Sequence, residues 1–108
     1  MAYNEGIAHR IQKCIDLIPE AFTQKKMFGG IAFLYHGKMT VGVVKDELMV
    51  RALGSKMPKL LQQKYVRPMD FTGKPMKEFI FVAPEGFKSE EQLQSFVELG
   101  LEHAKSKL

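Results

Sequence analysis

The 108-residue sequence has few of the features from which disulfides, metal sites or membrane anchors are built. Its single cysteine, Cys14, excludes an internal disulfide and any cysteine-rich metal site. No apolar run approaches the roughly 20 residues that a membrane-spanning helix needs. The first residues lack the basic-then-apolar pattern of a signal peptide. These absences lead us to expect a cytoplasmic protein that does not associate with membranes.

What remains is the composition of an ordinary folded protein. Hydrophobic residues make up 45% of the chain and charged residues 26%, which is close to the average for globular proteins. A chain of this length fits one folding unit with its own core. We therefore expect a single domain spanning residues 1–108.

Hydrophobic spacing predicts the order of helices and strands. Apolar residues recur three and four positions apart near both ends of the chain, and Ser89 with Gln92 matches a capping box at a helix start. Helices are predicted at about residues 4–18, 56–65 and from Ser89 onward, and strands at 28–35, 39–44, 48–53, 67–71 and 78–82. The order α-β-β-β-α-β-β-α predicts a two-layer α+β fold, with helices on a five-stranded antiparallel sheet.

The pair Gly29-Gly30 is the one glycine cluster that invites a phosphate-binding interpretation. A nucleotide-binding P-loop needs Gly-x4-Gly-Lys-Ser/Thr, and this spacing is not present around Lys38. A strand bulge or a close backbone crossing explains the two glycines better. We therefore expect no nucleotide or other cofactor.

The reactive side chains are scattered. Cys14 shares the apolar face of the first predicted helix, which favours a buried and inert thiol. The three histidines, His9, His36 and His103, fall on separate elements with no metal-ligand spacing. The sequence therefore predicts neither a catalytic residue nor a metal site.

Positive charge is concentrated in the middle of the chain. The net charge is +4, and residues 51–88 hold eight basic and three acidic side chains, whereas the residues from Ser89 onward hold two basic and four acidic ones. Such a bias favours an anionic partner, although solvated lysines are the simpler alternative. The candidate residues for binding a partner or an anion are Lys25, Lys26, Arg51, Arg67, Lys74 and Lys77.

Several short segments resemble a known family. They are Lys26-Met27-Phe28-Gly29-Gly30, the turn His36-Gly37-Lys38, Leu48-Met49-Val50-Arg51, the stretch from Arg67 to Met76, and Phe79-Ile80-Phe81-Val82 with Pro84. On these segments the chain resembles the TfoX N-terminal domain family. The resemblance implies structural roles for Met27, Phe28, Gly29, Gly30, Gly37, Gly73 and Pro84, and the same α+β fold.

The resemblance also implies a regulatory context. Proteins of this family include bacterial regulators of natural competence, which help a cyclic-AMP-responsive activator to switch on DNA-uptake genes. Those regulators carry a second, C-terminal domain, and we expect this chain to be a stand-alone N-terminal module. It departs from the family at Thr40, where an aromatic residue is frequent, and at Glu78, where glycine is common.

Three functional hypotheses follow. The first is a non-enzymatic binding module that acts by protein–protein contacts in transcriptional regulation. The second is a small enzyme, or an accessory subunit of a nucleic-acid-modifying system, with a pocket near Gly29-Gly30. The third is a chaperone-like homodimer that binds a client segment. We expect a protein partner first; nucleic acid is less well supported, because only three of 16 basic residues are arginine.

Overall fold

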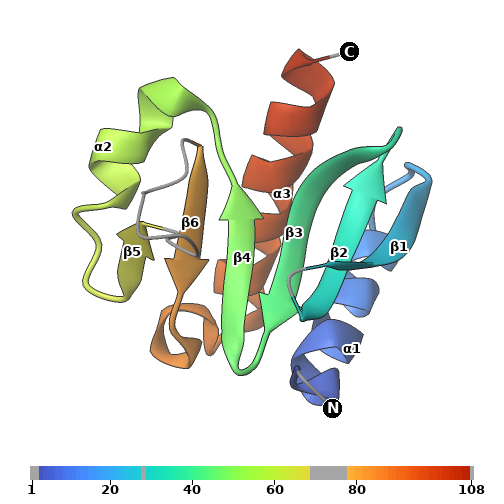
Figure 1. Cartoon of the computed structure of the whole chain (residues 1–108), viewed down its shortest axis with the longest axis horizontal. Coiled ribbons are helices and arrows are strands. Elements are labelled where there is room, and N and C mark those ends of the chain that lie inside the picture. The colour runs from blue at the N-terminus through green and yellow to red at the C-terminus, as the bar shows by residue number, and fades with distance from the viewer. Residues whose placement is uncertain (1–2, 28, 69–77, 108) are drawn as a thin grey trace.

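The computed structural model describes residues 3–27, 29–68 and 78–107, and these form a sheet with helices packed against it (Figure 1). The strands are β1 (Phe22–Met27), β2 (Gly30–Tyr35), β3 (Lys38–Val44), β4 (Glu47–Arg51), β5 (Val66–Pro68) and β6 (Phe79–Val82). The helices are α1 (Glu5–Asp16), α2 (Met57–Leu60) and α3 (Glu90–Ser106), with 3-10 turns η1 (Gly54–Lys56) and η2 (Pro84–Phe87).

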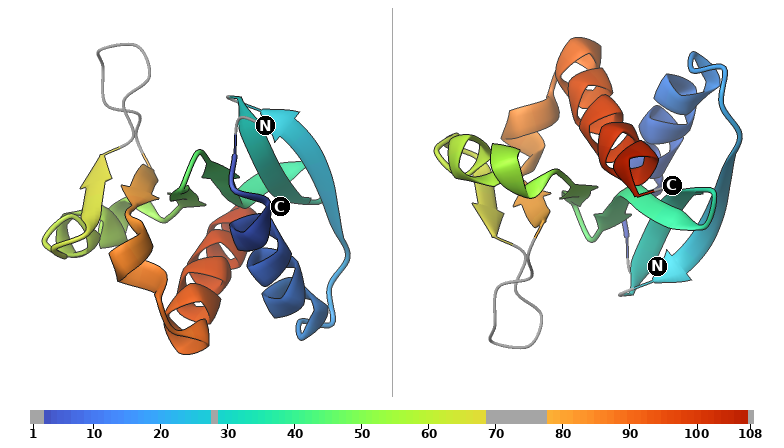
Figure 2. Two further views of the ribbon diagram at one scale, coloured as in Figure 1. Left: turned by 90° about the horizontal axis from the view of Figure 1, so that it is seen from below. Right: turned by 90° about the horizontal axis from the view of Figure 1, so that it is seen from above.

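The strands pair in the order β1-β2-β3-β4-β6-β5, and every neighbouring pair is antiparallel. Helices α1 and α3 lie side by side on one face of this sheet (Figure 2). The predicted α+β class, antiparallel sheet and two-layer arrangement are therefore confirmed.

The predicted number of strands is wrong, because the described residues form six and not five. The missed strand is β1, whose central residues Thr23 to Lys26 are all polar and exposed. An edge strand of this kind shows no alternation of apolar and polar residues. The second helix is also shorter than predicted: α2 ends at Leu60, and the predicted strand 67–71 is described only as far as Pro68.

The main core lies between the sheet and the helices. Alternate residues of each inner strand point toward α1 and α3, as the two-residue period of a strand requires. From the sheet come Ile31, Phe33, Val41, Val43, Leu48, Val50, Ile80 and Val82, and from the helices Ile7, Ile11, Cys14, Ile15, Leu93, Phe96 and Val97. Burial of each large apolar side chain contributes roughly 1.5–3 kcal/mol of transfer free energy.

Helix α3 approaches β3 closely where Gly100 meets the backbone of Thr40. A Cβ atom at Gly100 would lie 2.4 Å from the Thr40 carbonyl oxygen, so no side chain fits between the two elements. The pairing of β2 with β3 shifts register between Phe33 and Leu34, and the Thr40 hydroxyl donates a hydrogen bond of 2.8 Å to the Phe33 carbonyl oxygen there. The buried bulge is thus hydrogen-bonded and fixes the position of α3.

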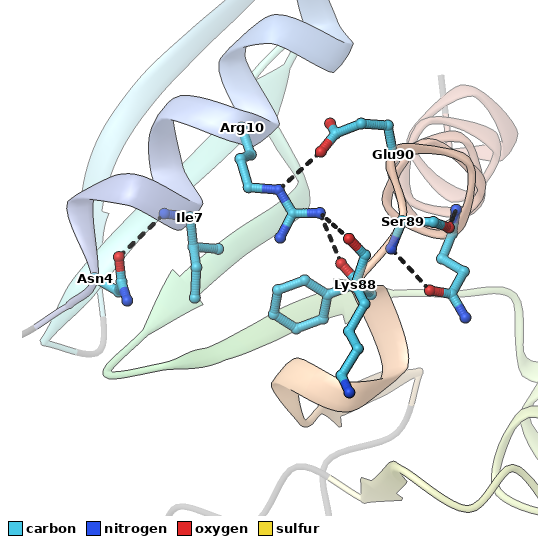
Figure 3. A network of polar contacts seen from close by, with 8 residues as sticks. Asn4, Ile7, Arg10, Lys88, Ser89 and Glu90 are labelled. Atoms are coloured by element: carbon cyan, nitrogen blue, oxygen red, sulfur yellow. Dashed lines mark hydrogen bonds and ion pairs between the residues drawn. The ribbon is translucent and has the colours of Figure 1, made fainter.

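Arg10 joins α1 to the start of α3 (Figure 3). Its Nη2 donates to the carbonyl oxygen of Phe87 at 2.7 Å and to that of Lys88 at 3.2 Å. Its Nε pairs with the Glu90 carboxylate at 3.1 Å. Beside this network Ser89 and Gln92 form the predicted capping box. The two helices are therefore linked by polar contacts as well as by the core.

No helix in the described part of the chain has the length and apolar composition that crossing a bilayer requires.

Candidate functional site

A pocket of about 600 Å³ opens at the end of the sheet where β4 ends and β6 begins. The last turn of α3 borders it on one side and the β2–β3 hairpin on the other. Its described lining consists of Lys25, Leu34, Gly37, Lys38, Met39, Arg51, Phe79, His103 and Lys107. We call it the basic pocket.

Four cations line the basic pocket: Lys25, Lys38, Arg51 and Lys107. None of the four takes part in a salt bridge with any residue that the structure describes. The described lining also contains no carboxylate. The pocket therefore has an uncompensated positive charge, which attracts anions.

These cations come from separate elements. Lys38 starts β3 directly after a tight turn in which His36 and Gly37 both adopt positive φ, 51° and 78°. Arg51 is the last residue of β4, and Lys25 lies in the edge strand β1. Lys107 follows His103 by four residues, so both face the pocket from one side of α3. Lys25 and Arg51 are among the candidate residues that the sequence predicted, and the other lining residues are not.

His103 is almost completely buried, with 1% of its surface exposed, and is paired with Glu78. Its Nε2 lies 3.1 Å from Oε1 of Glu78, and Oε2 of Glu78 accepts the Gly54 N–H at 3.0 Å. The hydrogen bond with His103 is the largest influence on this carboxyl and lowers the pKa of Glu78. The Gly54 N–H and the charge of Lys107 act in the same direction, against the effect of partial burial.

Glu78 holds this position in an unfavourable backbone conformation. Its φ is +64°, in the left-handed region that glycine adopts more easily than other residues. The backbone itself is anchored, because the Glu78 carbonyl oxygen accepts the Ala52 N–H at 3.0 Å. The side-chain contacts with His103 and Gly54 further stabilise the conformation.

Two buried nitrogen atoms at the basic pocket have no hydrogen-bond partner among the described residues. They are Nδ1 of His103 and Nε of Arg51. Because a carboxylate can only accept, the Glu78 contact places a proton on Nε2 of His103 and leaves Nδ1 for another group. Buried polar atoms of folded proteins are nearly always hydrogen-bonded to protein or to ordered water, so these two nitrogens are candidate contact atoms for a water or a ligand.

The sheet face opposite to α1 and α3, which we call the outer face, carries a row of residues from edge to edge. In register across the strands are Lys25, Ala32, Gly42, Met49, Phe81 and Arg67. The middle of the row is buried, with Ala32 and Met49 at 0% exposure. Its two ends are cationic. The outer face is therefore an apolar strip between basic edges.

Two arginines cover aromatic rings on the outer face. The Arg51 guanidinium lies 4.9 Å from the ring centre of Phe79, and that of Arg67 lies 4.6 Å from the ring centre of Phe81. Arg67 also forms a salt bridge with Glu47. Arg67 thus lies on the same face as Arg51 but outside the described lining of the basic pocket.

Lys26, another predicted binding residue, is not part of the described lining of the basic pocket. Lys26 pairs with Ile31, whose side chain is in the main core, so its register position is on the face opposite to Lys25. Lys74 and Lys77 lie outside the described residues. Lys26 thus lies apart from Lys25, and its role in binding a partner or an anion stays a prediction.

The residues of the family motifs have structural positions. A Cβ at Gly30 would lie 2.0 Å from the Val43 carbonyl oxygen, so this glycine permits a close strand approach. Gly29 has φ +75°, and Pro84 begins η2. Met27 ends β1. Phe28 and Gly73 lie outside the described residues.

Cys14 has the buried position that its helical spacing predicted. It is 3% exposed, and burial, followed by the nearby Glu90 carboxylate, raises the pKa of its thiol. A thiol in this environment is a poor nucleophile. Among the residues that the structure describes, no three His, Cys, Asp or Glu side chains are grouped so that they could hold a metal ion.

The comparison with known proteins gives one match. The model of the TfoX N-terminal domain family matches residues 18–104. No curated protein and no solved structure matches the chain. The match covers the sheet and nearly all of α3.

Proposed function

Because the chain belongs to the TfoX N-terminal domain family, we propose that it is a non-enzymatic regulatory module that binds a protein partner in the control of bacterial transcription. The family supports a module of the competence-regulator type. We add to this the proposal that the partner binds to the outer face. The observation that carries it is the row of residues with Lys25 at one edge and Arg67 at the other.

An acidic protein surface is the partner that this face fits best. The positive charge of Lys25 at the β1 edge would steer such a surface toward the sheet. Arginine stacked on aromatic rings is a frequent component of protein interfaces, and Arg51 on Phe79 has this arrangement. The lysine at the β1 edge has no salt-bridge partner among the described residues, so its charge is available.

The enzymatic alternative has one observation in its favour, the contact of Glu78 with His103. A carboxylate that orients a histidine is a common part of catalytic sites. The basic pocket, however, has no serine, threonine, cysteine or aspartate in its described lining, and it does not include Gly29 or Gly30. The arrangement can hold a ligand, but its described lining offers no hydroxyl or thiol beside the histidine, so binding is the better-supported function.

The chaperone-like alternative needs a large exposed apolar surface. In the described ranges only three large hydrophobic side chains are exposed, those of Leu17, Leu61 and Tyr65. A stable dimer or client interface buries on the order of 1,600 Å² in total. These three residues offer much less apolar area, which supports regulatory binding over client holding.

The proposal can be tested by photocrosslinking in the bacterium that encodes the protein. A crosslinking residue is placed at Thr23, which shares the outer face with Lys25, and for comparison at the exposed Glu91 of α3. We expect one protein to be captured from Thr23 only. Lys25→Glu should abolish the capture and reproduce the transcript changes of a gene deletion, whereas Lys26→Glu should do neither. Equal effects of the two substitutions would contradict the outer-face proposal.

A further inference from the structure

We propose that the basic pocket binds the phosphate group of a small organic phosphate ester, with the organic part of the ligand against the apolar wall. The pocket shares Lys25 and Arg51 with the outer face, but the inference rests on the cavity, and binding of a small phosphate ester is measured without any protein partner. Three features of the pocket carry it: its charge, its two unpartnered nitrogens and its apolar wall.

The positive charges that line the basic pocket favour an anionic ligand. Four cations line the pocket without a described ion-pair partner. A second cavity of similar size, about 590 Å³, lies between α1 and η2 and shows the contrast. Its lining balances Arg10 and Lys88 with Asp46 and Glu85. Of these two cavities, the basic pocket therefore has the excess of positive charge in its described lining. A phosphate monoester, with a charge of about −1.5 to −2 at neutral pH, matches that excess better than a carboxylate does.

The unpartnered nitrogens supply directed hydrogen bonds. Nδ1 of His103 and Nε of Arg51 belong to side chains that line the pocket, and neither has a described acceptor. His103 comes from α3 and Arg51 from β4, so side chains with an unpartnered nitrogen line the cavity from both layers of the fold. A phosphate group has three strong acceptor oxygens and can serve several donors at once.

Glu78 prepares the histidine for this role. Its carboxylate holds Nε2 of His103 at 3.1 Å, which fixes the orientation of the ring and leaves Nδ1 as the second hydrogen-bonding atom. In the imidazolium form Nδ1–H donates to the anion. Glu78 is the carboxylate next to the pocket, and both of its oxygens are engaged, one by His103 and one by Gly54. Its negative charge is thus directed at these groups.

The C-terminal end of α3 carries a partial negative charge, and Lys107 at its C-cap offsets it. Lys25, Lys38 and Arg51 are strand residues and do not share this role. The anion is therefore held mainly by the cations of the sheet.

The apolar wall indicates an organic ligand rather than a bare ion. Leu34, Met39 and Phe79 line the pocket beside the cations. Its volume of about 600 Å³ is in the range of small-molecule sites, which is roughly 300–1,000 Å³. Inorganic phosphate would leave this wall without a contact.

The experiment titrates the full chain with three probes: phenyl phosphate, inorganic phosphate and benzoate. Calorimetry measures affinity, and NMR follows the imidazole nitrogens of His103 and the ring of Phe79. We expect saturable binding of phenyl phosphate, at least about tenfold tighter than either other probe. Tighter or equal binding of inorganic phosphate would overturn the organic-ligand part. Tighter or equal binding of benzoate would overturn the phosphate assignment.

Matched variants locate the site. Lys25→Met and Arg51→Met should each weaken phenyl phosphate binding at least about tenfold, whereas Lys26→Met should change it less than about twofold. Arg51→Met also removes an unpartnered buried nitrogen, so we expect its melting temperature to stay at the wild-type value. Lys38→Met provides a second test on another strand. Equal weakening by Lys25→Met and Lys26→Met, or no resonance shift at His103, would overturn the proposal.

Discussion

Glu78 and His103, which are 25 residues apart in the sequence, join the start of β6 to the last turns of α3 through a contact of 3.1 Å. Each residue is unusual on its own. Glu78 has positive φ without being glycine, and His103 is a polar side chain at 1% exposure. Together they form a buried cross-link next to the basic pocket. Four predictions test this cross-link and the surrounding structure.

The free-energy cost of the positive φ at Glu78 can be measured separately from the stability that its side-chain contacts contribute. Glu78→Ala and Glu78→Gly both remove the contacts with His103 and Gly54, but only glycine adopts φ +64° without strain. We expect the glycine variant to be more stable than the alanine variant by about 1 kcal/mol in urea unfolding. Both should be less stable than the wild type, by about 1–3 kcal/mol for alanine. Equal stability of the two variants would show that the positive φ carries no strain.

The lowered pKa of Glu78 makes part of the stability depend on pH. A carboxyl whose pKa is lower in the folded state contributes stability above its ordinary pKa, and the contribution is lost as the pH falls through the folded value. The wild type should therefore exceed Glu78→Gln in melting temperature at neutral pH, and the difference should shrink in acid. Hydrogen bonding to Tyr35 also lowers the pKa of Glu20. Glu20 is present in both proteins, so its effect on the melting temperature cancels in the difference between them. A difference that stays constant from about pH 7 to about pH 3 would contradict the Glu78 assignment.

The close contact of α3 with β3 predicts an unusual result for Gly100→Ala. Alanine normally favours a helix over glycine by about 1 kcal/mol. Here its Cβ would lie 2.4 Å from the Thr40 carbonyl oxygen, so α3 must move away from the sheet. We expect a net loss of about 1–3 kcal/mol in thermal or urea unfolding. Glu98→Ala, at an exposed position of the same helix, should stay within about 0.5 kcal/mol of the wild type. A stabilised Gly100→Ala protein would contradict this packing.

Binding to nucleic acid is tested by titrating the protein against labelled double-stranded DNA and single-stranded RNA at about 50 and about 200 mM salt. Binding through phosphate contacts weakens steeply over this range. We expect no sequence-selective binding, because only three of the 16 basic residues are arginine and one of them, Arg67, is engaged by Glu47. Tight, strongly salt-dependent binding that Lys25→Glu removes and Lys26→Glu retains would instead assign the outer face to nucleic acid.

Local patterns were enough to predict most elements. The capping box at Ser89 and the apolar stripe that follows it identify α3, and the burial of Cys14 follows from helical spacing. Strand β1 was not predicted, because it is stabilised by pairing with β2 and not by a pattern of apolar residues of its own. A polar edge strand is recognisable only when its neighbour is known.

The pocket was predictable only in part, because it depends on which elements meet. Lys25 and Arg51 were candidate binding residues from the sequence, but nothing local joins them to Lys38 or Lys107. His103 did leave a signal: it follows the buried Phe96 by seven residues and so lies on the buried face of α3. A histidine at such a position requires a partner inside the protein. The identity of that partner, Glu78, comes from the tertiary structure.

The polarity that concealed β1 has a further consequence for the protein in a crowded cell. An open sheet ends in two strands whose free N–H and C=O groups can recruit strands from other molecules and start fibrous aggregates. At one end of this sheet the charges of Lys25 and Lys26 oppose such recruitment. At the other end, β5 is only three residues long and finishes in Pro68, which has no N–H to donate. Lysine side chains at one edge of the sheet and a proline at the other thus oppose strand pairing between molecules, although none of these residues belongs to the core.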